Sequence, residues 1–188
     1  MVPKPNTLVN VATLETSRLM LRGWRDLDVE PWVTMSADER VMEFFPRPYT
    51  RAEAEKFASW ARSELERNGF GWWVVEVKDE IPFAGVVCVQ RVPFDAPFTP
   101  AKEIGWRLAL PAWGRGFAYE GARAALDHVF RTLGWPEVVA MTSTLNLRSQ
   151  KLMQRLGMTH DPSDDFDHPR LPVGHRLQRH VLYRIKRG

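Results

Sequence analysis

The sequence predicts an α+β fold built around one central sheet. Hydrophobic residues make up 44% and charged residues 26% of the 188 positions, which is typical of a folded globular protein. Several short stretches alternate apolar and polar residues like strands, whereas two longer stretches repeat with the helical period. No repeat, low-complexity tract or linker divides the chain. A chain of this length holds one domain with a full core, without the help of a disulfide or metal.

The chain is expected to begin with a flexible arm over residues 1–13, ahead of a single domain over residues 14–188. The arm contains two prolines and shows no hydrophobic period. Residues 19–24 alternate like a strand. Asp26 is then expected to cap a helix over residues 27–35, because short acidic side chains favour that position.

A second helix is expected to begin at Thr50. Thr50 and Glu53 have the spacing of a capping box, in which each side chain bonds the other residue's backbone N–H. Asn68 and Gly69 favour the end of this helix. Between them, apolar residues recur at helical intervals, namely Ala54, Phe57, Ala58, Ala61 and Leu65.

The middle of the chain is rich in expected strands. Residues 72–77 and 83–89 flank Lys78-Asp79-Glu80, which predicts a hairpin. A third strand is expected over residues 103–110, after a proline-rich loop.

The last third alternates between helix and strand signals. Residues 117–133 are alanine-rich, have a helical period and end at a glycine. Residues 138–144 predict a strand, residues 147–156 a short helix, and residues 180–185 the last strand. Residues 159–174 are rich in proline and aspartate and predict a loop.

Charge and cysteine content narrow the function classes. The net charge is only +3 and both signs are interspersed, which argues against a nucleic-acid-binding stripe. Cys88 is the only cysteine, so an internal disulfide and a multi-cysteine zinc site are excluded, and a reducing compartment is favoured. Its apolar strand predicts a buried, inert thiol.

Membrane association is not expected either. No apolar run approaches the roughly 18 residues that span a bilayer, and the amino terminus lacks a signal-peptide core. We therefore expect a cytoplasmic protein.

Residues 108–118 predict an anion-binding turn. A strand ends, Gly114 and Gly116 follow, and a helix begins at once. The first N–H groups of a helix lack internal partners and lie at the positive end of its dipole, so a phosphate fits there. Arg115 could add a charge-assisted contact. Tyr119 stands where a Rossmann turn needs glycine, and no Walker lysine follows. A plain turn whose glycines serve only backbone geometry is the alternative.

Four segments resemble the GNAT superfamily of N-acetyltransferases, in its RimJ/RimL-like branch of ribosomal-protein amino-terminal acetyltransferases. The turn resembles the acyl-CoA pyrophosphate loop Arg/Gln-x-x-Gly-x-Gly/Ala, with Gly116 and Ala118 at its last two fixed positions. Trp113 replaces the first, which removes one side-chain contact and leaves the main-chain site intact. The resemblance covers about residues 14–185. Its other segments are residues 14–22, Glu103-Ile104-Gly105-Trp106, and Asn146-x-x-Ser149 leading to Leu156-Gly157-Met158.

The resemblance implies a fold, a co-substrate and its contacts. The fold would be a GNAT-like acyl-CoA N-acyltransferase fold, with a mixed, strongly bent central sheet and helices on both sides. Acetyl-CoA would be the co-substrate, with no metal. The strand before the turn would splay from its neighbour. The cofactor contacts would be Leu108, Ala109 and Leu110 through their backbone, the turn residues Trp113, Gly114, Arg115, Gly116, Phe117 and Ala118, and also Asn146 and Ser149.

Glu103 and Ser149 are the candidate catalytic residues. Glu103, the candidate base, shares a strand face with Gly105 and Arg107; an exposed edge carboxylate is the alternative. Ser149 would lie by the sulfur as a proton donor. Asn146 and Ser149 also suit the start of a helix, so a local capping role is the alternative for both.

The acceptor is expected to be a primary amine, on a protein amino terminus or a small molecule. The neutral amine would attack the thioester directly in a ternary complex. Neutralising a lysine-like amine at pH 7 costs about 4.6 kcal/mol, and an α-amine only about 1.1 kcal/mol. A weakly placed base would therefore favour an amino-terminal acceptor.

Two adjacent tryptophans bear on the acceptor pocket. Trp72 and Trp73 face opposite sides of one strand, so one is expected in the core. The other is expected at the acceptor pocket, with Trp24, Trp32 or Phe44, although ordinary packing is the alternative.

The acidic stretch from Asp161 to His168 predicts a solvated loop. A metal site, or a surface that draws a cationic amine to the cleft, is the alternative. For the whole protein, a non-catalytic acyl-CoA-binding module is the runner-up, and an RNA-associated protein is the third hypothesis. Dimerisation is common among similar proteins, and nothing in the sequence fixes it.

Overall fold

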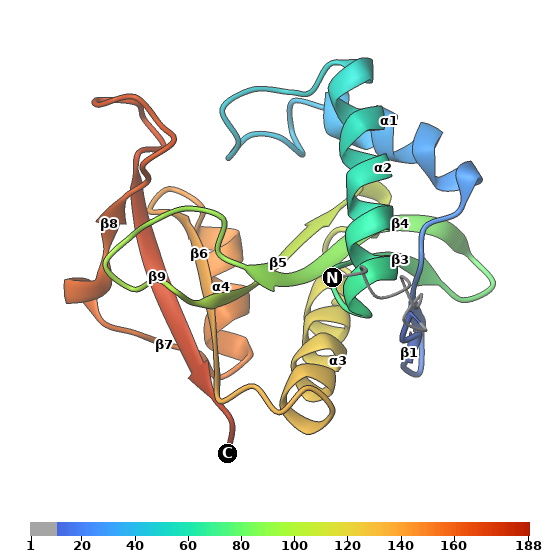
Figure 1. Cartoon of the computed structure of the whole chain (residues 1–188). Helices are drawn as coiled ribbons and strands as arrows, with labels where there is room; N and C mark the ends of the chain where they lie inside the picture. The colour runs from blue at the N-terminus through green and yellow to red at the C-terminus, as the bar shows by residue number, and fades with distance from the viewer. Residues whose placement is uncertain (1–10) are drawn as a thin grey trace, which may run out of the picture.

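A mixed β-sheet runs through residues 11–188, the part of the protein that the computed structural model describes (Figure 1). Its strands are β1 (Leu14–Glu15), β2 (Leu19–Arg22), β3 (Trp72–Val77), β4 (Ile81–Arg91), β5 (Lys102–Leu108), β6 (Glu137–Ser143), β7 (Thr159–His160), β8 (Phe166–Asp167) and β9 (Arg179–Lys186). Within the described residues these nine strands lie in the order β1-β2-β3-β4-β5-β6-β9-β7, with β8 paired to β9. Only β5 and β6 are parallel.

Helices cover both faces of this sheet. They are α1 (Val29–Ala37), α2 (Arg51–Asn68), α3 (Phe117–Arg131) and α4 (Leu147–Arg155), with short 3-10 helices η1 (Asp26–Asp28), η2 (Leu110–Ala112) and η3 (Pro162–Asp164). In Figure 1, α1 and α2 lie above the sheet and α3 lies below it. α2 contacts β3, α3 contacts β4 and β5, and α4 contacts β6. The predicted α+β fold, a mixed sheet with helices on both sides, is confirmed.

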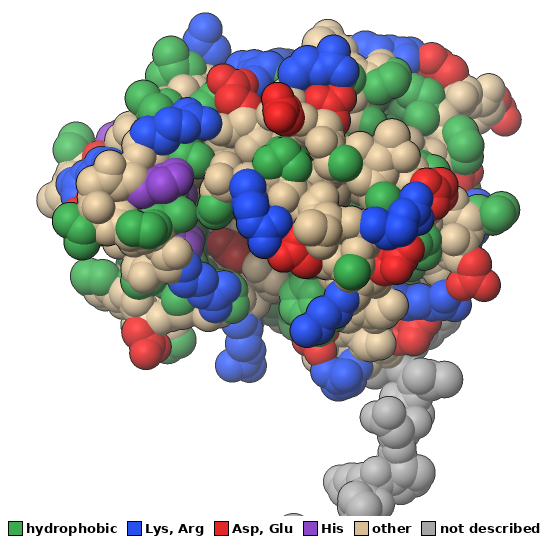
Figure 2. Space-filling model, turned by 90° about the horizontal axis from the view of Figure 1, so that it is seen from above, with side chains coloured by type: hydrophobic (Ala, Val, Ile, Leu, Met, Phe, Trp, Pro, Cys, Tyr) green, Lys and Arg blue, Asp and Glu red, His purple; other side chains and the backbone are tan. Residues whose placement is uncertain are grey.

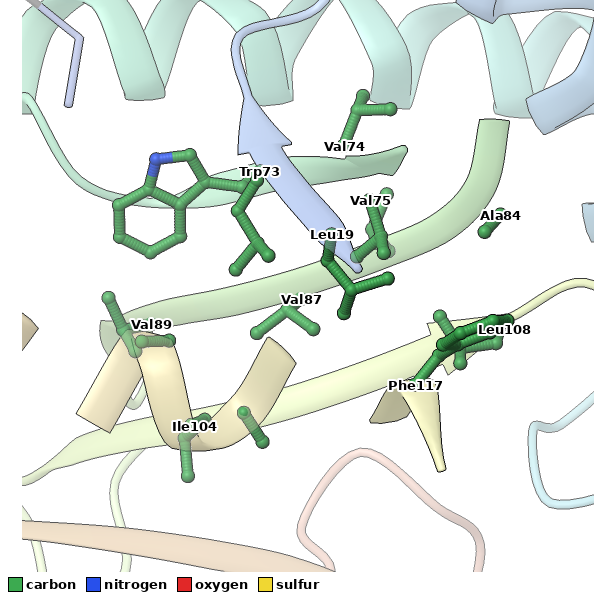
Figure 3. Packing of buried hydrophobic residues seen from close by; sticks show 14 of the residues in the cluster. Leu19, Trp73, Val74, Val75, Ala84, Val87, Val89, Ile104, Leu108 and Phe117 are labelled. Carbon is green, nitrogen blue, oxygen red and sulfur yellow. The ribbon is translucent and has the colours of Figure 1, made fainter. Parts of the chain in front are cut away.

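The core fixes the start of α3 against the sheet. Figure 3 shows Leu19, Val87 and Leu108 from three strands on the side of the sheet where Phe117 begins α3. Phe117 is 1% exposed. A Cβ added at Gly121 would meet Cγ2 of Val87 at 3.2 Å, so this glycine lets α3 lie close to β4.

β5 and β6 separate soon after they begin. They share one aligned pair, Glu103 with Val139. β4 and β5, by contrast, stay aligned from Gly85–Leu108 to Arg91–Lys102. β6 instead pairs along its whole length with β9. One edge of β5 therefore faces an opening in the sheet, where its main-chain groups have no strand partner.

The capping box predicted for α2 is confirmed. The Thr50 side chain accepts a hydrogen bond from the Glu53 N–H, and the Glu53 carboxylate accepts one from the Thr50 N–H. The helix ends at Gly69, whose φ of 74° lies in the left-handed region that glycine favours.

The prediction that Asp26 caps a helix over residues 27–35 is wrong. Asp26 instead begins the short helix η1, and α1 begins at Val29. Asp28 is the buried acid, and its carboxylate accepts from Nη1 and Nη2 of Arg22 at 2.7 and 2.9 Å. Asp28 also accepts from the Arg25 N–H, so it combines a capping contact with an ion pair to Arg22 on β2.

Element ends differ from the predictions by a few residues. The strand expected to reach Leu110 ends at Leu108, because Leu110 begins η2. The helix expected to reach residue 133 ends at Arg131. The tail expected to be a loop contains β7 and β8, which are too short to show a hydrophobic period.

The predicted arm is only partly described. Its residues 1–10 lie outside the described residues. The carbonyl of Ala12 accepts a hydrogen bond from the Trp73 indole at 2.8 Å, which fixes this segment on the sheet. None of the helices between residues 11 and 188 combines the length and apolar character needed to cross a bilayer.

Candidate active site

A cleft of about 1330 Å³ occupies the opening beside β5. β4 and β5 line it on one side, and the start of α3, α4 and the segment between α1 and α2 line the others. The face seen in Figure 2 is hollowed, with Lys and Arg side chains around the opening. Predicted site residues from three separate segments line this cleft: Glu103, Leu108, Trp113, Gly114, Gly116, Phe117, Ala118, Asn146 and Ser149. Ala109, Leu110 and Arg115 are not among its lining residues.

The glycine turn presents unpaired main-chain donors. Gly114 and Gly116 have φ values of 73° and 81°, which other residues rarely adopt. A Cβ at Gly114 would meet nothing within 4 Å, so backbone conformation rather than space requires glycine there. Within residues 11–188, the N–H groups of residues 114–119 donate to no protein acceptor. They lie at the amino end of α3, where the helix dipole favours an anion.

The arginines at this turn are already paired with carboxylates. The Arg115 guanidinium donates to both Glu80 oxygens at 2.6 and 2.7 Å. Arg18 donates to Glu120 at 2.7 Å and to the Arg115 carbonyl at 3.0 Å. The predicted side-chain contact from Arg115 would require this ion pair to break, so the anion-binding capacity of the turn rests on its main chain.

Trp113 closes the turn onto the end of β5. Its indole Nε1 donates to the Leu108 carbonyl at 2.7 Å. The Arg148 guanidinium lies 4.4 Å from the Trp113 ring centroid, which joins α4 to the turn. This bulky aromatic residue, at a position expected to be Arg or Gln, therefore has a packing role.

Leu108, Ala109 and Leu110 are predicted to contact a cofactor through their backbone, and they differ in whether their N–H groups are free to bind it. The Ala109 N–H donates to Ala84 at 2.9 Å, and its carbonyl accepts from Ala112, so both groups are occupied. Strand alternation then directs the Leu108 N–H toward the opening. The Leu110 N–H has no acceptor within the described residues.

Glu103 lies in the cleft, where β5 and β6 begin to separate. Its carboxylate accepts a hydrogen bond from Nε2 of Gln90 at 2.5 Å, and Gln90 in turn accepts from the Trp72 indole at 3.0 Å. Burial raises the pKa of Glu103 above its ordinary value, although Gln90 and the charge of Arg170 oppose the shift. A carboxylate with a raised pKa is better matched to accepting a proton near neutral pH.

Asn146 and Ser149 form the start of α4. The Asn146 Oδ1 accepts from the Ser149 N–H at 3.2 Å, and its Nδ2 donates to Thr142 at 3.0 Å. Asn146 is therefore the helix cap. The Ser149 hydroxyl makes no hydrogen bond within the described residues and lines the cleft, where it is available to a ligand.

The two adjacent tryptophans divide as predicted. Trp73 is fully buried, and Trp72 lines the cleft. Phe44 lines it too, whereas Trp24 and Trp32 are buried in the core. Sequence reasoning missed Gln90, because its position opposite Glu103 follows from strand register and from no motif.

The acidic stretch makes local contacts with neighbouring side chains. Asp161 accepts from the Ser163 N–H, Asp164 pairs with Arg184, and Asp165 pairs with His160. Of these contacts, the Asp164–Arg184 pair joins the tail to β9.

A mixed sheet that splays beside a glycine turn, with open amides at a helix start, forms a cleft suited to a ligand that carries a phosphate group. Residues 18–159 match the acetyltransferase (GNAT) domain family. The chain belongs to the GNAT acetyltransferases, a family of enzymes that use acetyl-CoA.

Known proteins agree with this assignment. FsC-acetyl coenzyme A-N(2)-transacetylase of Aspergillus fumigatus is 34% identical over 155 residues, which are 79% of this chain and 65% of that protein. The chain thus spans less than two thirds of that relative. An acetyltransferase (GNAT family) structure from Bacillus anthracis has a TM-score of 0.77 at 20% identity, over 94% of this chain and 99% of that one. RimL, a ribosomal L7/L12 alpha-N-protein acetyltransferase in complex with coenzyme A, has a TM-score of 0.74 at 16% identity, over 93% and 98%.

Proposed function

We propose that this protein transfers an acetyl group from acetyl-CoA to a primary amine by direct attack in a ternary complex. One observation carries the proposal: Glu103 lines the same cleft as residues 114 and 116–119 of the glycine turn, whose N–H groups have no acceptor within residues 11–188. The amides would hold the diphosphate of acetyl-CoA. The Leu108 N–H, at the open edge of β5, and the Leu110 N–H, at the start of η2, would bind its pantetheine arm.

The amine nitrogen would attack the thioester carbon and form the new C–N bond as the C–S bond breaks. Glu103 would accept the proton that the amine loses. Ser149 would donate a proton to the departing sulfur and regain one from solvent, to which Glu103 returns the proton taken from the amine. Positioning of the two substrates in one cleft would supply much of the rate.

The acceptor would be a small amine or a protein amino terminus. The RimJ/RimL-like motifs favour an amino terminus, and the similarity to the RimL fold is in keeping with this. The 34% identical relative is named as an acetyl coenzyme A-N(2)-transacetylase, which favours a nitrogen as the acceptor atom. Both kinds of acceptor would place a neutral amine beside Glu103.

The test compares two glycine variants. Gly116→Val forces a branched side chain into a left-handed conformation and should misdirect the amides of the turn. Gly174→Val imposes the same strain, at φ 82°, in a loop outside the cleft.

Released thiol would be measured with acetyl-CoA and a panel of amines, and the product identified by mass spectrometry. The wild type and Gly174→Val should turn over, and Gly116→Val should lose at least about tenfold in kcat/KM for acetyl-CoA. Tight acetyl-CoA binding without turnover on any amine would instead favour the non-catalytic binding module.

A further inference from the structure

Arg107 is a buried cation without a counter-ion. It lies on β5, shares a face with Glu103 and Gly105, and is 7% exposed. Within residues 11–188, no carboxylate lies within ion-pair distance of it, and its Nε has no hydrogen-bond acceptor. Its Nη1 reaches only the Sδ of Met42, at 3.5 Å. Arg115 and Arg148, by contrast, are each paired with a carboxylate.

Aromatic rings surround the Arg107 guanidinium without neutralising it. Its central carbon lies 4.0 Å from the Phe45 ring centroid, 5.1 Å from that of Trp32 and 5.4 Å from that of Tyr49. Burial lowers the pKa of Arg107, and Tyr49 opposes this shift; a guanidinium nevertheless stays charged at neutral pH. Ring stacking repays only part of the cost of a desolvated charge.

The position of Arg107 makes it accessible to a ligand in the cleft. Arg107, Phe45 and Tyr49 all line the cleft that also holds Glu103. Arg107 and Glu103 are four residues apart on one extended strand, which places their Cα atoms about 13 Å apart. A single small molecule can therefore reach both side chains.

We infer that Arg107 binds a carboxylate of the acceptor, so that the acceptor is a small primary amine that also carries a carboxylate group. This inference rests on the proposed function. A carboxylate fits because the planar guanidinium fork binds it through two parallel hydrogen bonds. The amine end of the acceptor then lies toward Glu103, and the carboxylate end lies beside Phe45 and Tyr49, which line the cleft.

The test uses matched amines that differ only in the carboxylate. The probes are the ω-amino acids from glycine to ε-aminocaproate and their carboxamides, compared at equal concentrations of neutral amine. For the wild type, kcat/KM should be at least about tenfold higher for the best carboxylate than for its amide. Arg107→Gln should bring this ratio to about one, and Arg107→Lys should retain part of it. Arg62→Gln, on the far side of α2 from the cleft, should keep the wild-type ratio.

A binding measurement makes the inference independent of turnover. The N-acetylated products and their carboxamides would be titrated by calorimetry into the wild type and both Arg107 variants, with coenzyme A present. Carboxylates should bind at least about tenfold more tightly than amides to the wild type, and equally to Arg107→Gln. The ratio of carboxylate to amide affinity is taken within one variant, so a partial loss of folded protein does not change it. The ratio for the wild type can be measured even if neither variant folds.

The outcomes separate the inference from the proposed function. Acetylation of amines without carboxylate preference would overturn the role of Arg107 and leave the acetyltransferase intact. Carboxylate-selective binding with no acetyl transfer to any amine would overturn the activity and retain the carboxylate site. If Arg107→Gln kept the preference for carboxylates over amides, another group would bind the carboxylate. If this variant also had a lower melting temperature, the role of Arg107 would be to stabilise the fold.

Discussion

Glu103 occupies an unusual position for a strand residue, because β5 places it in a cleft. There, among residues 11–188, its carboxylate accepts a hydrogen bond from the side-chain amide of Gln90 and forms no ion pair. The chain of hydrogen bonds from Trp72 through Gln90 holds the carboxylate in place without a cationic partner. A carboxylate that is fixed yet unpaired with a cation keeps its ability to accept a proton.

Glu103→Gln should therefore lower kcat by about a hundredfold and leave the acetyl-CoA dissociation constant unchanged. The variant should also lose the rise in kcat/KM that accompanies ionisation of this carboxyl. Steady-state kinetics across pH, with calorimetry for binding, would measure both. Glu66→Gln, on the exposed face of α2, is the matched control. An unchanged kcat would remove Glu103 from the mechanism.

The same residue predicts a change of stability with pH. Burial raises the Glu103 pKa, so between the ordinary and the raised pKa the folded state binds more protons than the unfolded state. The wild type should therefore lose stability as pH rises through that window. Glu103→Gln should have a melting temperature at or above that of the wild type at pH 7, with a difference that shrinks below about pH 4. Thermal unfolding across pH would show this, and a less stable variant at pH 7 would count against it.

Substitutions at Ser149 and Asn146 should have different effects, the first on kcat and the second on stability. Ser149→Ala should lower kcat at least about tenfold with an unchanged melting temperature, because its hydroxyl bonds nothing in the described chain. Asn146→Ala should cost about 1 kcal/mol of stability, because it removes the cap of α4. Kinetics and thermal unfolding of both variants would test this. Equal loss of stability in the two would contradict the assignment of the cap.

At the scale of elements, the start of α1 is held by a tertiary contact. Asp28 lies in a buried pair with Arg22, 4% and 5% exposed at their side chains, and Glu76 binds the same arginine. Asp28→Asn should cost about 3 kcal/mol, which lowers the melting temperature by about 6–12 °C for a chain of this size. Asp26→Asn, whose side chain is 94% exposed, should change it little. Equal loss of stability in the two variants would instead support the prediction that Asp26 caps the helix.

Most elements could be predicted from local pattern, and the exceptions have one cause. The capping box of α2 and the strand over residues 72–77 depend on neighbouring residues, and both are confirmed. The role of Asp28 depends on how the chain turns Arg22 of β2 toward it, and β7 and β8 depend on pairing with β9. Local reasoning has no access to such partners.

At the scale of the molecule, the site depends on where two strands stop pairing. The glycine turn and Glu103 were each recognisable in the sequence as candidates. The separation of β5 from β6 after Glu103, which brings them into one cleft, is set by register. Arg107 likewise looked like an ordinary strand residue, and only its burial without a carboxylate partner marks it.

The central claim is that the main-chain amides of residues 114–119 receive the diphosphate of acetyl-CoA. Residue-resolved amide hydrogen exchange, with and without saturating acetyl-CoA, tests it directly. These amides have no acceptor within residues 11–188, so they should exchange rapidly and become at least about tenfold slower on binding, while Gly174, which does not line the cleft, stays unchanged. Equal exchange of residues 114–119 in the two states, at a concentration where acetyl-CoA is bound, would contradict the account.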